Sequence, residues 1–422
     1  MFDEGLLAGI HRVRTVDGAA RGPVDTDPAR LKVLDLGTQL AGPFAASLLG
    51  DLGAEVIKVE MPGGGDPLRG PDGLSPRWQI ESRNKRCVTL NLRVGEGQEL
   101  LRRLARWADV LVENFRPGVM ARWGLAYADL AEVNPRLVYV SVSGFGQDGP
   151  KRALPGYDHI GSAFGGLTHL SGPRDRPPAP PGVTVVDYST GMLAAMGALE
   201  AVRRRDAAGG SGRGEWVQTA LYETILRIIG TDLAQWSMTG QIRERVGGQP
   251  AGERESASAH TYTFRTADER WVVAYPISDK QFGSLADLIG DPVLREPRFA
   301  TRPGRIAHAA DLDVVLRRWV AGQNADELLR LLAESDVPAS PVNTVADIAI
   351  DPHVQSQDSV LAVTNAHGQE MLMPAVTPRL VEEPGAIRWP GERLGTSNEA
   401  VYQGLLGIDV EDLAGLRERG VV

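Results

Sequence analysis

The chain has 422 residues, which exceeds the size of a single ordinary hydrophobic core and predicts two or three domains. Its composition, 42% hydrophobic and 23% charged, is typical of a soluble globular protein. The net charge of −9 comes from acidic and basic residues that are mixed along the chain, which argues against nucleic acid as the main partner and leaves small anionic ligands open.

The N-terminal residues and the single cysteine indicate a cellular compartment. No apolar run is long enough to span a membrane, and residues 1–30 have neither the apolar centre nor the cleavage site of a signal peptide. Cys87 has no partner for a disulfide, which fits a reducing compartment. It lies in RCVTLNL, which alternates as a strand does, so we interpret it as structural. We therefore expect a cytoplasmic protein with no membrane partner.

From residue 31 the sequence alternates between short apolar runs and segments with helical spacing. Buried strands are indicated by LKVLDLG, EVIKVE, ADVLVENF and RLVYVSVS, and amphipathic helices by FAASLLGDLG and GQELLRRLARWA. Such alternation is typical of parallel strands joined by crossover helices. The sequence therefore predicts an α/β fold with an open, mostly parallel sheet, helices on both faces, and ligands at the carboxyl ends of the strands.

The rest of the chain changes in character and predicts domain boundaries. The first residues lack sustained periodicity and are interpreted as an extension. Beyond a polar linker, a hairpin is predicted by YTFRTADERWVVAYPI, and three amphipathic helical stretches follow it. We expect an N-terminal extension (1–30), the first part of a large domain (31–224), a linker (225–258), a small α+β domain (259–345) and a C-terminal return to the large domain (346–422).

A glycine-rich loop follows the strand predicted by RLVYVSVS. Gly144, Gly146 and Gly149 have the G-x-G-x-x-G spacing of a dinucleotide-binding loop. Pro150 comes next, and the segment KRALPG cannot form the helix that holds the pyrophosphate in such sites. We therefore interpret the loop as a turn that ends a parallel strand and lets a ligand approach the backbone closely.

Asp187 is the carboxylate whose position is most suggestive of chemistry. It lies at the end of the apolar run in GVTVVDYSTG, and we expect a helix to begin after it, with Ser189 or Thr190 as the cap. An aspartate there stays ionised beside helix amides, which suits either capping or nucleophilic attack, and the spacing alone favours capping. The seven histidines are scattered without a metal-binding motif, so we expect no metal site.

Several longer motifs occur in an order that resembles one known family. They are LDLGTQLAGPFAASLLGDLGAEVIKVE, ESRNKRCVTLNL, ADVLVENFRPGVMARWGL, NPRLVYVSVSGFGQDGP, PGYD and GVTVVDYSTG. Over residues 31–420 the chain resembles the class III CoA-transferases, the family of formyl-CoA transferase and carnitine CoA-transferase. The resemblance implies a Rossmann-like sheet that binds CoA at its carboxyl edge, and a homodimer of two chains threaded as interlocked rings. The predicted linkers at 225–258 and 335–350 fit such a dimer.

The resemblance also implies site residues. The family's nucleophile is the aspartate of the motif GVTVVDYSTG, which here is Asp187. The positions implied to line the CoA site are Gln39, Leu40, Ala41, Leu90, Asn91, Leu92, Arg93, Asn114, Phe115, Arg116, Arg122, Ser143, Gly144, Phe145 and Gly146.

One position departs from the family's pattern. Where several relatives place a basic residue, this chain has Met61. The nearby cations that could bind the CoA phosphates instead are Lys58, Lys85, Arg86 and Arg93. The family's glycine-rich lid corresponds to residues 247–249 of this sequence.

The resemblance implies a covalent mechanism with CoA thioesters as substrates and no bound cofactor. Asp187 attacks an acyl-CoA donor to give a mixed anhydride, and the released thiolate returns to form an aspartyl-CoA thioester. A carboxylic acid acceptor then repeats these steps in reverse. Backbone amides of the glycine loops are expected to stabilise the oxyanions.

Two other functions remain open from the sequence. The α-methylacyl-CoA racemases share this fold and use a histidine where this chain has Tyr157, although His159 lies close enough in sequence to replace it. A non-catalytic acyl-CoA-binding protein is the other alternative, and the presence of Asp187 argues against it.

The sequences of several motifs resemble those of one branch of the family. That branch transfers CoA from succinyl-CoA to dicarboxylates such as malate, citramalate or itaconate. A dicarboxylate needs a cation or several hydrogen-bond donors for its distal carboxylate. The candidates from the sequence are Arg83, His159, Arg243 and Arg245.

Overall fold

The computed structural model describes residues 15–16, 22–173, 175–245, 262–365 and 367–422. The chain divides into two compact units. The first unit comprises Met1–Leu167, Pro181–Thr239 and Ile350–Val422, and the second comprises Thr168–Pro180 and Gly240–Ala349. None of the helices in the described part of the chain is long and apolar enough to cross a membrane.

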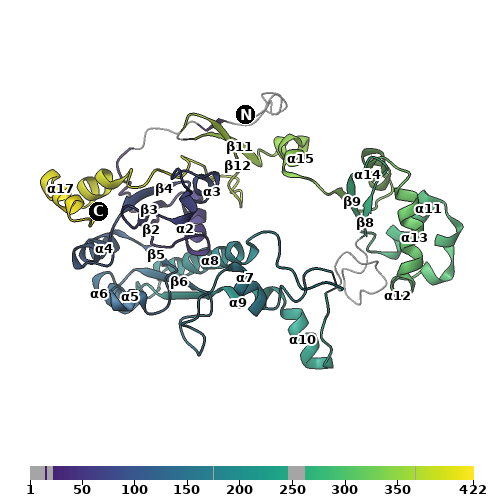
Figure 1. Ribbon diagram of the computed structural model, residues 1–422, viewed down its shortest axis with the longest axis horizontal. Helices are drawn as coiled ribbons and strands as arrows, with labels where there is room; N and C mark the ends of the chain where they lie inside the picture. Colours follow the sequence, from purple (N-terminus) through teal and green to yellow (C-terminus); the bar gives the residue numbers. More distant parts are fainter. Residues whose placement is uncertain (1–14, 17–21, 174, 246–261, 366) are drawn as a thin grey trace. The chain divides into compact units, whose positions relative to one another are not determined.

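A six-stranded parallel sheet forms the centre of the first unit (Figure 1). Its strands are β2 (Lys32–Asp35), β3 (Glu55–Glu60), β4 (Lys85–Thr89), β5 (Val110–Glu113), β6 (Val138–Ser143) and β7 (Trp216–Ala220). Their order in the sheet is β4-β3-β2-β5-β6-β7, and every pair of neighbours is parallel. This is the order of a doubly wound sheet, whose topological switch point lies between β2 and β5. The prediction of an open parallel sheet is confirmed.

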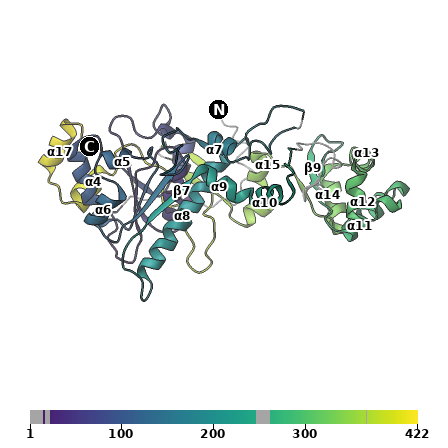
Figure 2. The same cartoon turned by 90° about the horizontal axis from the view of Figure 1, so that it is seen from below.

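Helices cover both faces of this sheet (Figures 1 and 2). The helices α2 (Ala41–Asp51) and α8 (Val185–Asp206) pack on one face. The other face is covered by α4 (Gly95–Trp107), α5 (Val119–Arg122), α6 (Tyr127–Val133) and α17 (Val410–Glu418). The two cores follow the alternation of strand side chains, since Val110 and Val112 belong to the first and Leu111 to the second.

The C-terminal residues cover the edge strand β4. The carboxylate of Glu392 accepts a hydrogen bond from the Cys87 amide (2.7 Å), and Oδ1 of Asn398 accepts one from the Thr89 amide (2.9 Å). These side chains take the place of a further strand and leave the edge protected. A second sheet of this unit joins β1 (Thr15–Val16), β11 (Val360–Thr364) and β12 (Glu370–Pro374).

The second unit is a small α+β domain. Its sheet contains β8 (Tyr262–Arg265), β9 (Trp271–Ala274) and β10 (Ala339–Pro341), and the first two form the predicted antiparallel hairpin. Its helices are α11 (Asp279–Ile289), α12 (Arg302–Ala307), α13 (Ala309–Val320), α14 (Ala325–Glu334) and α15 (Val345–Ile350). Phe264, Leu312 and Leu328 are buried at the centre of one core between this sheet and these helices.

The remaining elements are short and connect the main ones. They are η1 (Pro67–Arg69), α3 (Pro76–Glu81), α7 (Asp158–Phe164), α9 (Leu221–Ile228), α10 (Gly230–Thr239), η4 (Pro292–Arg295), η5 (Pro297–Phe299), α16 (Pro352–Ser356) and η6 (Ala400–Leu405). The predicted linker 225–258 is therefore helical as far as Thr239 among its described residues. Within the predicted N-terminal extension, Val24 is buried and belongs to the same core as the buried residues of α4.

Candidate active site

The loops that follow the parallel strands meet at the carboxyl edge of the sheet and form two pockets. The larger has a volume of about 360 Å³ and contains Asp187, so we name it the Asp187 pocket. It is lined by Thr38, Gln39, Leu40, Ala41, Pro67, Asn114, Phe115, Arg116, Pro117, Val142, Ser143, Gly144, Arg152, Leu154, Pro155, Gly156, Tyr157, Asp187 and Leu221.

The second pocket lies over the ends of β2, β3 and β4. It has a volume of about 200 Å³, and we name it the Arg93 pocket. It is lined by Leu36, Gly37, Thr38, Val59, Glu60, Met61, Gly65, Asp66, Leu90, Leu92, Arg93, Phe115 and Trp123. Thr38 and Phe115 line both pockets, so the two are neighbours at the switch point of the sheet.

Asp187 lies inside the first turn of α8, and the sequence prediction for this segment was wrong. The helix begins at Val185, not at Ser189 or Thr190. Its first amides are capped by a residue distant in sequence, because Oδ2 of Asp158 accepts hydrogen bonds from the amides of Val186 (2.8 Å) and Asp187 (3.0 Å). Asp158 thus performs the capping that the sequence alone assigned to Asp187, and the Asp187 carboxylate remains available for chemistry.

The surroundings of Asp187 make its ionisation costly. Burial and the neighbouring charge of Asp158 raise the pKa of Asp187 to about 6, although Arg77 and His159 act in the opposite direction. Arg77 reaches this region from α3, where it donates to Oγ1 of Thr184 (3.4 Å). A partly desolvated carboxylate that ionises near neutral pH is a stronger nucleophile than one held in an ion pair.

Two glycines of the glycine-rich loop and its continuation approach each other at the wall of the Asp187 pocket. A Cβ on Gly144 would lie 2.6 Å from the Cα of Gly156, so a side chain cannot be accommodated there. Gly146 has φ 91° and donates its amide hydrogen to Oγ of Ser143 (3.0 Å). The loop is therefore a tight turn after β6 that lines the Asp187 pocket through Ser143 and Gly144, and no helix follows it until α7.

The loop between β2 and α2 is fixed by side chains from three directions. Oδ1 of Asp35 accepts from the Gly37 amide (2.9 Å), and Asp66 accepts from the Gln39 amide (3.0 Å). The side-chain amide of Asn114 both accepts from Thr38 N (2.7 Å) and donates to Thr38 O (2.8 Å). The amides of Gly37 and Gly146 thus already have acceptors within the protein. The N-terminus of α2, which no side chain caps, faces the Asp187 pocket through Leu40 and Ala41.

Most of the predicted site residues line one of the two pockets. Those in the Asp187 pocket are Asp187, Gln39, Leu40, Ala41, Asn114, Phe115, Arg116, Ser143 and Gly144, and those in the Arg93 pocket are Leu90, Leu92, Arg93 and again Phe115. Asn91, Arg122, Phe145 and Gly146 line neither pocket. The Phe145 ring instead packs against Phe164, with centroids 5.1 Å apart.

Three of the four cations proposed for the CoA phosphates are buried in ion pairs, so that proposal was wrong for them. Lys85 lies 2.8 Å from Asp35, Lys58 lies 3.4 Å from Asp66, and Arg86 lies 2.5 Å from Glu55. Their burial is tolerated because each cation is paired with a buried carboxylate. Arg93 is the exposed member of that set and lines its pocket.

None of the four cations proposed for a distal carboxylate lines either pocket; these are Arg83, His159, Arg243 and Arg245. Arg83 is held by Asp51 in a bidentate pair at 2.5 Å, and Arg245 donates to the backbone oxygens of Pro173 and Arg176. His159 is exposed and lies 3.3 Å from Asp158, and it is not among the residues that line either pocket. Residues 247–249, proposed as a lid, lie outside the described part of the chain.

Arg152 is a pocket residue that the sequence analysis did not single out. It is exposed and lines the Asp187 pocket together with Arg116. The signal was present, since Arg152 directly follows the glycine-rich loop that was expected to face a ligand. Arg116 follows β5 in the same way, and the two guanidinium groups make this pocket suited to an anionic substrate.

Comparison with known proteins gives a consistent result. The sequence model described as CoA-transferase family III matches residues 29–398. A protein named "Succinyl-CoA--D-citramalate CoA-transferase" from Chloroflexus aurantiacus is 39% identical over 398 residues, which cover 93% of this chain and 97% of that protein. The "Succinyl-CoA--L-malate CoA-transferase beta subunit" of the same organism is 38% identical over 93% of this chain and 98% of its own length.

A solved structure is similar over most of the chain. It is that of a "CAIB/BAIF family protein from Brucella suis", which superposes with a TM-score of 0.77 at 31% sequence identity. The match covers 91% of this chain and 100% of that chain.

Proposed function

This chain belongs to CoA-transferase family III, and we propose that it transfers CoA from succinyl-CoA to a dicarboxylic acid such as malate, citramalate or itaconate. The observation that carries the proposal is the Asp187 pocket, which is lined by the partly buried Asp187 and by two arginines, Arg116 and Arg152, at the carboxyl edge of the sheet. Relatives at 39% and 38% identity are named for citramalate and malate, which supports this acceptor class.

The chemistry begins with the ionised Asp187 carboxylate. Its oxygen attacks the carbonyl carbon of the donor thioester, the C–S bond breaks, and CoA leaves as a thiolate while a mixed anhydride forms on Asp187. The thiolate then attacks the Asp187 acyl carbon and releases the donor acid as a carboxylate. An acceptor carboxylate then attacks the aspartyl-CoA thioester, which releases the CoA thiolate and forms a second mixed anhydride. The thiolate attacks the acyl carbon of the acceptor, which gives the new acyl-CoA and frees the Asp187 carboxylate. No net proton transfer is required.

We place the nucleotide part of CoA in the Arg93 pocket and its thioester in the Asp187 pocket. Arg93 is exposed at the first pocket and suits a phosphate, whereas the apolar Leu90 and Leu92 line the same wall. Thr38 and Phe115 line both pockets, so a ligand that spans them passes these two residues. The chain supplies binding and orientation, and the partly enclosed Asp187 pocket protects the anhydride from water.

A dicarboxylate presents one carboxylate to Asp187 and a second to the pocket wall. We assign the second to Arg152, whose guanidinium can bind a carboxylate with two parallel hydrogen bonds. The free carboxylate of a succinyl group would occupy the same position, which explains how one pocket can serve both donor and acceptor.

The racemase alternative requires a second base opposite Asp187. The corresponding position, Tyr157, lines the Asp187 pocket, and no histidine is among the described residues that line it. His159 is near enough to affect the pKa of Asp187 but points its ring to Asp158. A protein that only bound acyl-CoA would have no use for a carboxylate whose pKa is raised, so we do not favour that alternative.

The test is a transfer assay with purified protein. Succinyl-CoA is incubated with malate, citramalate, itaconate and a panel of monocarboxylates, and new CoA thioesters are identified by mass spectrometry. We expect thioesters of the dicarboxylates, and none with Asp187→Ala. A protein that gives no new thioester but exchanges the α-hydrogen of branched acyl-CoAs in deuterated water would be a racemase instead.

We also propose that the protein acts as a cytoplasmic homodimer. The single cysteine suits a reducing compartment. The dimer is supported by the solvent side of α8, where Met192, Met196 and Leu199 are 54%, 61% and 42% exposed in the single chain. A long helix that is apolar on both sides is normally covered on both sides.

A further inference from the structure

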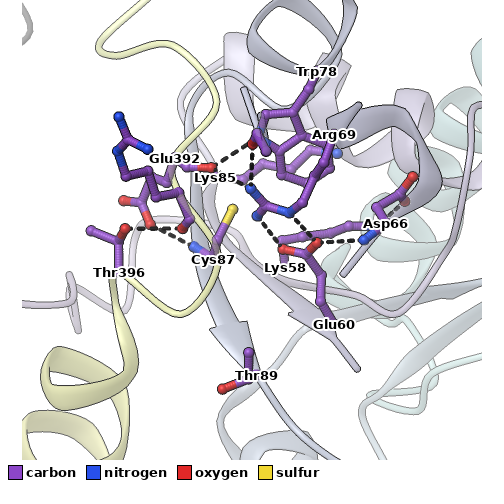
Figure 3. A network of polar contacts seen from close by, with 12 residues as sticks. Lys58, Glu60, Asp66, Arg69, Trp78, Lys85, Cys87, Thr89, Glu392 and Thr396 are labelled. Atoms are coloured by element: carbon purple, nitrogen blue, oxygen red, sulfur yellow. Dashed lines mark hydrogen bonds and ion pairs between the residues drawn. The ribbon is translucent and has the colours of Figure 1, made fainter. Parts of the chain in front are cut away.

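Figure 3 shows a network of buried charges that includes Lys58, Asp66 and Lys85. Lys58 is fully buried, and its ammonium group lies 3.4 Å from Asp66 and 3.6 Å from Asp35. Asp66 is 3% exposed and Lys85 is fully buried. Buried charges are costly unless they are paired and hydrogen-bonded. The backbone groups that complete the hydrogen bonds of these side chains are therefore held in fixed positions.

Lys58 and Asp66 bind the backbone of the loop between β2 and α2 directly. Nζ of Lys58 donates to the Gly37 carbonyl oxygen, and both carboxylate oxygens of Asp66 lie within reach of the Gln39 amide, at 3.0 and 3.3 Å. The network therefore holds the loop at the Gly37 carbonyl oxygen and at the Gln39 amide, which lie on either side of Thr38 in the chain.

The conformation held in this way is unfavourable by itself. Gln39 has φ 64°, in the left-handed region that residues other than glycine rarely adopt. Such a conformation persists only where its surroundings determine it. Gln39 is exposed, and its backbone is held by the hydrogen bond from its amide to Asp66 and by the hydrogen bonds between Asn114 and the neighbouring Thr38.

A second layer of the network holds Asp66 in turn. Its backbone amide donates to Oε2 of Glu60 (2.8 Å), and the guanidinium of Arg69 binds both oxygens of the same carboxylate at 2.6 and 2.7 Å. Arg69 lies 3.8 Å above the Trp78 ring, and Figure 3 shows it between Trp78 and Glu60. Glu60 and Asp66 both line the Arg93 pocket, and their pairing with Arg69 and Lys58 offsets the repulsion that two carboxylates would exert on a phosphate there.

We propose that Lys58 and Asp66 are positioning residues for CoA, which act by holding the Gly37–Gln39 backbone in the form that separates and shapes the two pockets. This inference rests on the proposed function, because it assumes that CoA occupies both pockets. Neither side chain takes part in the chemistry. Their effect on transfer passes through Thr38, which lines both pockets, and through Gln39 and Leu40 beside Asp187.

The test measures CoA affinity directly, by calorimetric titration of full-length variants with CoA. Asp66→Asn removes the ion pair with Lys58, and we expect the Kd for CoA to rise about tenfold or more. The matched control is Asp51→Asn, which breaks an equally buried pair with Arg83 (2.5 Å) that does not line either pocket. We expect both variants to melt at a similarly lower temperature and only the first to lose CoA affinity. Unchanged CoA affinity in Asp66→Asn, or an equal loss in Asp51→Asn, would overturn the proposal.

A second pair of variants keeps the test decisive if Asp66→Asn does not fold. Gln39→Gly and Gln39→Val both remove the side-chain amide, but only glycine tolerates a positive φ without cost. We expect CoA to bind the valine variant at least about fivefold more weakly than the glycine variant. Equal affinities would mean that the loop conformation does not matter. Transfer is measured separately, so that a parent protein that binds CoA without transferring it contradicts the proposed function and leaves the positioning inference standing.

Discussion

Asp187 and Asp158 show how one side chain can free another for chemistry. Asp187 lies in the first turn of α8, and the side chain of Asp158 reaches the same turn from α7; a helix N-terminus with two nearby carboxylates needs only one as its cap. Asp158 binds the amides of the first turn, and its negative charge together with burial raises the pKa of Asp187 to about 6. The arrangement suits a nucleophile that must be ionised at neutral pH yet remain reactive.

The pH dependence of transfer should follow the ionisation of Asp187. Its carboxylate is protonated below the pKa of about 6, so kcat/KM for succinyl-CoA should fall roughly tenfold per pH unit below that value. Asp158→Asn keeps an oxygen that can cap α8 but removes the charge that raises the pKa of Asp187. The acid limb of the profile should then move to lower pH, as measured by initial rates between pH 4.5 and 8. A limb that stays in place would show that another group titrates.

The same electrostatics predict that removal of the Asp187 charge stabilises the fold, even though it abolishes activity. The folded pKa of Asp187 is raised above the unfolded value, so the unfolded chain releases this proton at lower pH and ionisation favours unfolding. Asp187→Asn should abolish transfer and yet stabilise the fold by about 1 to 2 kcal/mol at pH 8. The gain should shrink as the pH falls from 6 towards 4, where both states are protonated. Urea unfolding at both pH values measures it, and a variant that is less stable at pH 8 would contradict the assigned environment.

Arg152 should determine selectivity for substrates with a second carboxylate. Arg152→Gln should lower kcat/KM for succinyl-CoA and for a dicarboxylate acceptor by about ten- to a hundredfold, because a charge-assisted bidentate contact is lost. Turnover of an acyl-CoA without a free carboxylate should change little. Lys151→Gln is the control, since Lys151 is the adjacent exposed cation and does not line the pocket. An equal loss for all substrates would indicate that Arg152 binds CoA.

The proposed role of Asp187 as the nucleophile could not be derived from local sequence. The β-branched Val185 and Val186 favour a strand, but Val186 is fully buried between α8 and the sheet and continues the helix. The cap comes from Asp158, far away in the chain, so no local pattern could reveal it. The assignment of Asp187 as the nucleophile therefore came from the resemblance to a family and not from spacing.

At the scale of elements, the strands and crossover helices of the large sheet were predictable because each carries its own periodic signal. The runs around β2, β3, β5 and β6 are buried on both sides, as their continuous apolar sequences indicate. Buried charges were not predictable in this way. A lysine in sequence indicates the surface, whereas Lys58 and Lys85 are buried beside Asp35. These three residues come from β3, β4 and β2, and only the order of the strands in the sheet brings them together.

The C-terminal segment that protects β4 should support the Arg93 pocket. Asn398 binds both the amide and the hydroxyl group of Thr89, and Thr89 directly precedes the pocket residues Leu90 and Leu92. Asn398→Ala leaves a buried amide without a partner and should cost about 1 to 3 kcal/mol of stability. It should also weaken CoA binding. Glu399→Ala is the control, because its contact with Arg417 is exposed and should contribute less than about 1 kcal/mol. Denaturant unfolding and CoA titration of both variants provide the comparison.

At the scale of the whole molecule, α8 carries both the proposed nucleophile and the surface that we assign to the dimer. Its first turn carries Asp187, its inner side packs on the sheet through Ala194 and Ala198, and Met192, Met196 and Leu199 form an exposed stripe along its other side. A second copy of the chain that covered this stripe would lie on the helix that holds the nucleophile.

Disruption of this stripe should convert the proposed homodimer to monomers. Met196→Glu places a charge on the apolar side of α8, where its burial in an interface would be costly. We expect the parent protein to sediment as a dimer and Met196→Glu as a monomer or a concentration-dependent mixture. Val410→Glu is the matched control, because Val410 is 71% exposed at the start of α17 and lies on the opposite face of the sheet from α8. An interlocked dimer would respond to the substitution only during folding, because two threaded rings cannot separate without partial unfolding.

Met196→Glu protein refolded from denaturant should therefore be monomeric, whereas dilution of the assembled parent dimer should not dissociate it within hours. A parent protein that sediments as a monomer would refute both the dimer and this role of α8.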